Sequence, residues 1–397
     1  LRTLLADNYV PRGSIYDRNG ILLAETIGEV GSLSRNYLYL SMSNVLGYDS
    51  VRYGRTGIEA GLNDYLRGNR GYPAFTQWIE NLITNQPLRG LDVRLTIDSK
   101  IQESISRMLQ ERKGGVAVIN AASGEILALS SFPSFNANVL EAEYENLKND
   151  PDAPFINRAT QSQYPSGKFL LPLVLLKKNE AELINLLNTE AKILTNCNQQ
   201  NDPFFSFSAA LTEGCEDAVM LVLKVAEDEE FRNVLENLKL PQNVSGLITN
   251  AFKLPEPISR FSITRGSAQI RSNPLQIAYA YSILSTDGEL ALPRIHDAVK
   301  TPNGAWVSIG NPTTSRIFPT GISTLVREFL VSDSIPGWEA NFQTTDENGA
   351  YSWFVGGIYS TAGINPIVVA VAIESESISS SKQIGHAILL SIILSQP

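Results

Sequence analysis

Few residues of this chain have the types and spacing that acid–base, metal or phosphate chemistry requires. The two histidines, His296 beside a Pro-Arg pair and His386 in the last apolar segment, occupy positions more typical of structure than of catalysis. Glu213, Glu216 and Asp217 form a local acidic cluster, which a solvated loop or a helix cap explains. No second carboxylate for glycosidase chemistry and no glycine-rich phosphate loop can be identified. The residues alone therefore predict no metal and no cofactor.

The two cysteines, Cys197 and Cys215, have a spacing that fits no metal-binding motif. Two interpretations stay open at this point. The cysteines are buried thiols if the protein works in a reducing compartment, and a disulfide is expected if the protein is exported.

The composition excludes some classes of partner. The 397 residues suffice for two domains, and the net charge of −9 argues against nucleic acid or an anionic membrane surface as the main partner. The longest apolar runs, residues 169–176 and 387–394, are too short to span a membrane, and we expect both to form core helices. Since the chain starts at Leu1 without a signal peptide, we expect an N-terminal membrane anchor to precede it.

The hydrophobic pattern predicts two parts. Residues 1–90 indicate turns, short strands and one helix at 58–66. Residues 91–397 begin with a strand, a helix capped by Asp98 and a hairpin at 115–131, and they end with a strand pair at 353–374 and a helix at 381–394. Helices and loops fill the middle. The fold class expected for this part is α+β, an antiparallel sheet with helices around it.

Short segments of the chain occur in the same order as motifs of class B penicillin-binding proteins. The chain therefore resembles that family, which implies a penicillin-binding/serine β-lactamase-like transpeptidase domain after a small, strand-rich pedestal. The pedestal motifs rest above all on Arg12, Gly13, Asp17, Arg18, Gly57 and Glu59. The later matches include Leu95-Thr96-Ile97-Asp98, Gly124-Glu125-Ile126-Leu127, Tyr164-Pro165, Pro274-Leu275-Gln276 and Trp353-Phe354-Val355-Gly356.

The nucleophile motif of the family differs in this chain. The family reads roughly Tyr-Pro-x-Gly-Ser-Thr-Phe-Lys-Pro, with serine and lysine on one face of a helix. Without a gap, Lys168 stands at the serine and Leu171 at the lysine. Ser166 and Ser162 are the alternatives for a displaced nucleophile. Ser166 precedes Lys168 by two positions only, so the two side chains would point to different faces of a helix.

The other two motifs of the family also differ. Where the family has Ser-x-Asn, this chain has Gly214 and Glu216, and Trp338, Glu339 and Ala340 stand where the family has Lys-Thr-Gly. A carboxylate at 339 would repel the substrate carboxylate that this motif binds. The resemblance with these replacements implies a protein that is not an enzyme and that penicillin does not label covalently.

Three functions compete on this basis. We favour a non-catalytic homologue that is a scaffold or regulator in peptidoglycan synthesis or division, at the extracytoplasmic face of the cytoplasmic membrane. Its expected partners are cell-wall synthesis proteins, in particular a SEDS-family glycosyltransferase. The second hypothesis is a module that binds peptidoglycan peptides without reaction, and the third is an active D,D-transpeptidase with a displaced nucleophile. We expect Leu171 and Trp338 to fill the former cleft.

Overall fold

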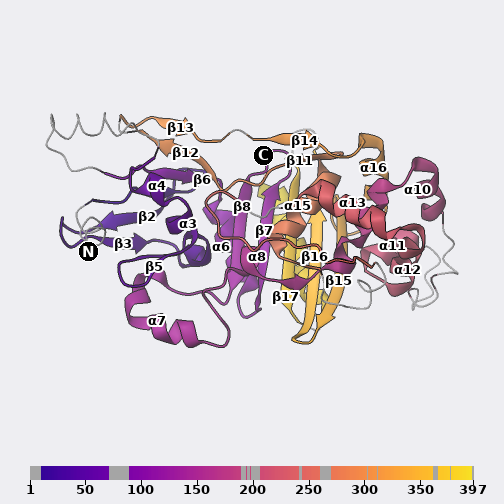
Figure 1. Cartoon of the computed structure of the whole chain (residues 1–397), viewed down its shortest axis with the longest axis horizontal. Coiled ribbons are helices and arrows are strands. Elements are labelled where there is room, and N and C mark those ends of the chain that lie inside the picture. The colour runs from indigo at the N-terminus through magenta and orange to yellow at the C-terminus, as the bar shows by residue number, and fades with distance from the viewer. Residues whose placement is uncertain are drawn as a thin grey trace.

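The computed structural model describes residues 10–70, 89–188, 194, 197, 206–240, 244–259, 270–301, 303–310, 312–360, 365–375 and 377–395. Figure 1 shows an elongated molecule, with the N-terminal part at one end, a large sheet in the centre and a group of helices at the other end. Across these ranges, no helix has the length and apolar character needed to cross a bilayer.

An antiparallel five-stranded sheet forms the centre, with the order β15-β16-β17-β7-β8. The two hairpins that we expected from sequence therefore join side by side through β17 and β7. Both strands are buried along nearly their whole length, because helices cover the two faces of the sheet. The strands are β7 (Gly114–Asn120), β8 (Ile126–Phe132), β15 (Trp338–Asp346), β16 (Gly349–Gly357) and β17 (Ile367–Glu374).

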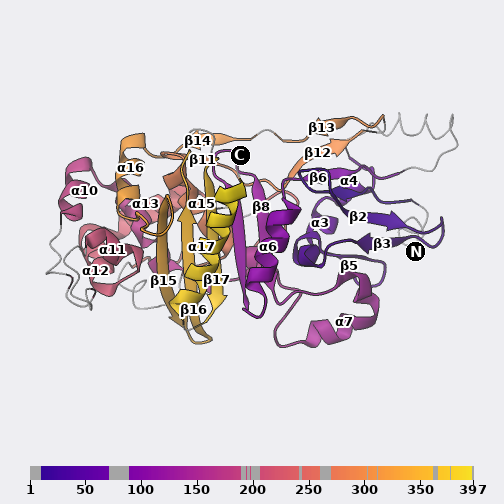
Figure 2. The ribbon, with the colours of Figure 1, turned by 180° about the vertical axis from the view of Figure 1, so that it is seen from behind.

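Helices pack on both faces of this sheet. The face seen in Figure 1 carries α8 (Arg158–Gln161) and α15 (Pro274–Ser285), and α15 is buried at every residue. The opposite face, seen in Figure 2, carries α6 (Ser99–Leu109) and α17 (Ile378–Ser395). The helices at the far end are α9 (Gly167–Leu170), the 3-10 helix η3 (Leu171–Lys177), α10 (Glu180–Leu187), α11 (Phe207–Thr212), α12 (Glu216–Val225), α13 (Asp228–Leu238) and α16 (Thr320–Glu328).

A second sheet of six strands, in the order β13-β12-β6-β1-β2-β3, forms the N-terminal part. Three of its strands come from beyond residue 90, so the sheet joins chain segments from both sides of the expected domain boundary, and that boundary stays a prediction. The strands are β1 (Ile15–Tyr16), β2 (Leu22–Ile27), β3 (Ser34–Tyr37), β6 (Val93–Leu95), β12 (His296–Lys300) and β13 (Trp306–Ser308).

Short elements complete the two parts. Around the second sheet lie η1 (Leu40–Met42), α2 (Ser43–Leu46), β4 (Asp49–Ser50), β5 (Gly54–Arg55), α3 (Gly57–Gly61), α4 (Asn63–Leu66), η2 (Ala137–Val139) and α7 (Leu140–Asn149). Two small strand pairs join β9 (Tyr164–Pro165) to β10 (Arg271–Ser272), and β11 (Glu289–Ala291) to β14 (Thr314–Arg316).

A buried ion-pair network holds the two pedestal motifs together. Glu59 is fully buried and accepts hydrogen bonds from Arg12 Nη2 at 2.8 Å and from Arg35 Nε at 2.6 Å. Burial works against the charged carboxylate, but Arg35 and Arg12 outweigh it and lower the pKa of Glu59. These paired charges therefore hold the segment around Arg12 against α3.

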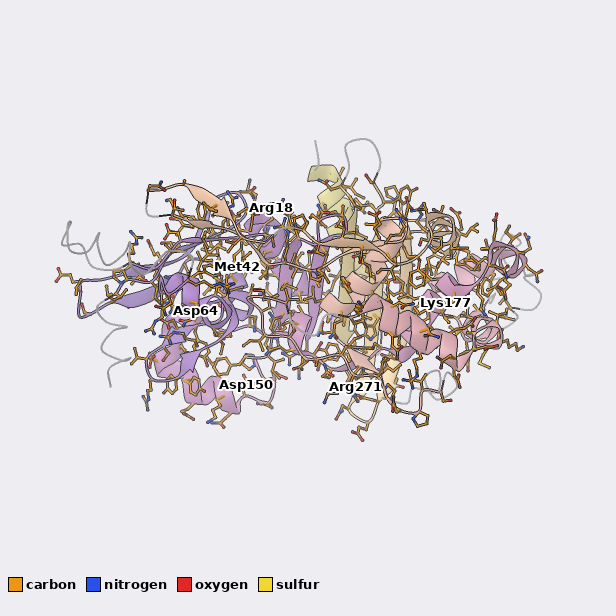
Figure 3. The ribbon with its side chains drawn as sticks, turned by 45° about the horizontal axis from the view of Figure 1, so that its top comes forward. Arg18, Met42, Asp64, Asp150, Lys177 and Arg271 are labelled. Atoms are coloured by element: carbon orange, nitrogen blue, oxygen red, sulfur yellow. A yellow bond between two sulfur atoms is a disulfide. The ribbon has the colours of Figure 1, made fainter. Side chains whose placement is uncertain are left out.

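The turn after β1 joins the N-terminal part to the central sheet. Buried Asp17 accepts a hydrogen bond from Ser99 Oγ at 2.7 Å, at the start of α6. Arg18 reaches Glu125 with 3.3 Å between Nη2 and Oε2, and Figure 3 shows Arg18 at the boundary between the two parts. Asp17 and Arg18, which the resemblance singled out, therefore hold the two parts in contact.

The expected α+β fold is confirmed, two details of the expectation are wrong, and one strand was not predicted. Asp98 caps α6 as expected, accepting from the N–H groups of Lys100 and Ile101. The single helix expected at 58–66 is two short helices, interrupted at Leu62. Most of the apolar run 169–176 forms the 3-10 helix η3, which contains a proline near its start. Strand β15 was not recognised from its pattern, because buried residues on both of its faces remove the alternation.

Substitution of Glu59 tests the ion-pair network. Glu59→Gln should lower the free energy of unfolding by about 3–5 kcal/mol, because the buried guanidinium of Arg35 loses its paired carboxylate and Arg12 keeps only Asp49, at 3.6 Å. Urea unfolding measures the change. Exposed Glu29→Gln is the control and should stay within about 0.5 kcal/mol of the parent protein. Equal unfolding midpoints for the two variants would contradict the role given to Glu59.

Candidate active site

Three segments that are far apart in sequence meet at the β15 edge of the central sheet. Phe169 of α9 packs edge-on against Phe342 of β15, with 5.3 Å between ring centroids. The loop between α11 and α12 touches the same strand, since a Cβ on Gly214 would lie 2.6 Å from the Asn341 carbonyl oxygen. The structure thus brings together the three segments that we aligned with the family motifs.

The position that we aligned with the family's nucleophile holds an amine and not a hydroxyl. Lys168 is half-buried in α9, and burial lowers the pKa of its ammonium group while the nearby charge of Glu216 opposes that shift. Leu171, three residues later, is 1% exposed and belongs to the hydrophobic core. Positions 168 and 171 therefore do not provide the hydroxyl and amine of a serine–lysine pair.

The two alternative serines are buried and bonded to the main chain. Ser166 is fully buried, and its Oγ lies 3.4 Å from the Ile270 carbonyl oxygen. Ser162 donates to the Arg158 carbonyl oxygen at 2.7 Å. An activated nucleophile needs a neighbouring base and an open path to the substrate. In the described part of the chain, neither serine has this arrangement.

The loop at the second motif has a backbone that suits glycine. Gly214 has a φ of +62°, a region that residues with a side chain rarely adopt, and Asn341 and Phe342 leave no room for a Cβ. Glu216 is exposed at the first turn of α12. Cys215 forms a disulfide with Cys197, with 5.8 Å between their Cα atoms. Of the two interpretations open for the cysteines, the structure has the disulfide.

The third motif divides between the two faces of the sheet, because side chains alternate along β15. Trp338 stacks on Tyr281 of α15, with 5.6 Å between ring centroids, and donates to Ser285 Oγ at 3.0 Å. Ala340 is buried in the same core. Trp338 and Leu171 are thus packed in the interior.

Glu339 faces α17 on the opposite side of the sheet. Its carboxylate forms a hydrogen bond with His386 Nε2 and lies 3.7 Å from Lys382 Nζ. The expectation that Glu339 would repel a substrate carboxylate is therefore wrong, since its charge is buried and paired away from α9. Lys382 also pairs with Glu213, so one lysine of α17 links the second-motif loop to the third-motif strand.

This charge network was missed from sequence, although it includes a histidine that we expected to be structural. Burial works against the charged form of Glu339, but His386 and Lys382 outweigh it and lower the pKa of the carboxyl. Lys382 and His386 are four residues apart on one helical face, and this spacing was the available signal. The other histidine, His296, lies at the start of β12, where burial lowers its pKa.

Metal ligands do not gather at this site. Across the described ranges, no three His, Cys, Asp or Glu side chains are grouped so that they could hold a metal ion.

Family models match most of the chain. Residues 12–93 match the penicillin binding protein A dimerisation domain, and residues 114–333 match the penicillin binding protein transpeptidase domain. PbpA of Mycolicibacterium smegmatis is 23% identical over 94% of this chain and 86% of its own length. MrdA of Acinetobacter baumannii is 25% identical over 77% of this chain. The chain matches half the length of that MrdA and 22% of the length of the Escherichia coli K12 MrdA.

Solved structures show the same fold. Penicillin-binding protein A of M. tuberculosis, as a ceftriaxone acyl-enzyme complex, has a TM-score of 0.81 at 18% identity, over 98% of this chain and all of that one. PBP2 of Pseudomonas aeruginosa has a TM-score of 0.75 at 19% identity, over 98% of this chain and 96% of that one. The likeness extends over both parts of the molecule.

The comparisons correct one expectation from the sequence. We expected a protein that is not an enzyme, because Lys168 and Leu171 replace the serine and lysine. The curated relatives, PbpA and MrdA, are named peptidoglycan D,D-transpeptidases, so the sequence falls among enzymes. Inferring the absence of activity from these replacements was therefore wrong.

The Glu339 network predicts a pH-dependent stability. The lowered pKa means that the stabilisation from ionised Glu339 is fully present above the unfolded value of 4.5 and is lost as the pH falls through the folded value. Glu339→Gln should therefore be less stable than the parent protein at pH 7, and the difference should shrink as the pH falls below 4.5. Urea unfolding at several pH values measures it. A difference that does not change with pH would rule out the titration of Glu339 as its origin.

Restoring the serine–lysine pair tests the nucleophile position. Lys168→Ser with Leu171→Lys places a hydroxyl and an amine three residues apart on one helical face. We expect this double variant to take up about tenfold more fluorescent penicillin than the parent chain, because a serine hydroxyl beside a lysine amine is the nucleophile pair of this family. Intact mass locates the adduct. Equal, measurable labelling of the two proteins would show that a group outside positions 168 and 171 reacts, and no labelling of either protein would show that the two substitutions do not restore the reactive pair.

Proposed function

Because the chain belongs to the penicillin-binding protein transpeptidase family, we propose that it acts in bacterial peptidoglycan synthesis, as a scaffold or regulator that binds other cell-wall synthesis proteins. In this proposal it is located on the extracytoplasmic face of the cytoplasmic membrane, where peptidoglycan is built. The N-terminal part provides the binding surface.

The observation that carries this proposal is a set of exposed apolar side chains in the N-terminal part. Large apolar residues that project into solvent within a short stretch of chain are typical of a protein–protein binding site. Their exposed fractions are 45% for Ile27, 57% for Val30, 47% for Leu38, 57% for Leu40 and 52% for Val51.

The framework under these side chains is rigid. Ile27 and Val30 lie at the β2–β3 turn, and Arg35 on β3 is tied to Glu59 by the buried ion pair. Asn138 closes part of the outer edge of β3, because its side chain bonds both the N–H and the carbonyl group of Tyr37. A surface held in this way loses little conformational entropy when a partner binds.

The proposed partner is a membrane-embedded glycosyltransferase of the SEDS family. Class B penicillin-binding proteins, which the chain resembles, pair with such enzymes through the pedestal. The Arg12–Glu59 contact inside the pedestal and the Asp17–Ser99 contact that joins the pedestal to α6 do not involve Lys168 or Trp338. Binding through the pedestal is therefore independent of the chemistry at α9.

Substitutions at the β2–β3 turn test the proposal. The membrane-anchored full-length protein should recover the glycosyltransferase in a pull-down, and Ile27→Glu with Val30→Glu should reduce recovery about tenfold, because charges replace apolar contacts. Leu394→Glu is the matched control, since Leu394 is 85% exposed on α17 and should leave recovery unchanged.

Two results would overturn the proposal. One is the absence of glycosyltransferase from the parent sample, and the other is equal recovery by the double variant and the parent. Circular dichroism of each variant separates a lost contact from a lost fold.

A further inference from the structure

A pocket of about 720 Å³ lies between the N-terminal part and α6. Its lining comes from residues 38–41, from one side of α6 and from the end of β8 with the loop that follows. Gln102 of α6 donates to the Ser41 carbonyl oxygen at 3.0 Å, which holds the two walls together. Figure 2 shows α6 on the face of the sheet opposite to α15, so this pocket is separate from the site around Lys168 and Trp338. Its volume is typical of small-molecule sites.

One wall of the pocket is apolar. Leu38 and Leu40 are about half exposed, at 47% and 57%, and Tyr39, Phe132 and Phe135 contribute aromatic rings to the lining. When a ligand covers apolar side chains in a concave surface, binding is favoured because apolar surface is removed from water. The wall therefore favours a ligand with apolar side chains.

The opposite wall carries one charge of each sign. Glu103 and Arg107 are exposed and lie four residues apart on α6, with Ser106 and Gln110 on the same side of the helix. Arg107 Nε contacts the Glu103 carbonyl oxygen at 3.4 Å, which leaves the rest of the guanidinium free to bind an anion. Among the described residues, neither side chain forms an ion pair, so both charges are available to a ligand.

We propose that this pocket binds a short peptide of two or three residues with free termini. The peptide carboxylate pairs with Arg107 and its ammonium group with Glu103, while its apolar side chains cover Leu40 and Phe132. Positions 103 and 107 are about 6 Å apart along the helix axis, at a rise of about 1.5 Å per residue. A dipeptide spans up to about 7 Å, so its termini can reach both charges. The inference does not depend on the proposed scaffold role, although Leu38 and Leu40 belong both to this pocket and to the exposed apolar set of the N-terminal part.

Titration calorimetry of the full chain with the dipeptide Leu-Phe tests this. The probe should bind, and the same dipeptide with acetylated and amidated ends should bind about tenfold more weakly, because it lacks both charges. Arg107→Ala and Glu103→Gln should each weaken binding of the free dipeptide, by about tenfold for Arg107→Ala. Arg112→Ala is the matched control. Arg112 is exposed beyond the end of the same helix and donates to the Met108 carbonyl oxygen, outside the pocket, so this variant should bind as the parent does.

Three outcomes would overturn the inference. They are no heat of binding up to the solubility limit of the dipeptide, equal affinity for the free and blocked forms, and equal affinity of the Arg107→Ala and Arg112→Ala variants. Thermal unfolding of each variant confirms that the fold is intact before binding is compared.

Discussion

The pairing of β15 with β16 is the constraint on which the candidate site depends. The register, which places Trp338 opposite Gly357 and Glu339 opposite Gly356, sends alternate side chains to opposite faces of the sheet. The indole therefore enters the core beside α15, and the carboxylate meets α17. Each residue has an environment that suits it, since the ring is packed and hydrogen-bonded and the charge is paired.

The same strand determines how its neighbours are built. A glycine is needed at 214 because the loop lies directly on the backbone of β15. Lys382 connects that loop to Glu339, and the Cys197–Cys215 disulfide holds the loop from its other side. Substitutions in the loop at Gly214 and in the strand at Glu339 are therefore not independent, because the loop, the strand and α17 contact one another.

The sequence was sufficient for the parts of the fold that depend on local patterns. The Asp98 cap and the strand-pair at each end of the larger part follow from hydrophobic spacing, and the order of short motifs indicated the α+β fold. The sequence did not predict contacts between residues that are far apart in the chain. The pairing of Glu339 with His386 and Lys382 requires knowledge of which face of β15 meets α17. The sequence shows a lysine at position 168, but this one residue does not decide whether the protein is an enzyme.

The second sheet has a consequence for how the chain is made. Its middle strand pair, β1 and β6, is parallel, and β12 and β13 are added from residues 296–308. A ribosome releases the first four strands long before it synthesises the last two. The edge of β6 that pairs with β12 must therefore stay unpaired during most of synthesis. Pairing between strands that are distant in sequence slows folding, and a strand edge that is unpaired in the meantime is prone to aggregation. Completion of the N-terminal part is thus a late event, tied to the C-terminal half of the same molecule.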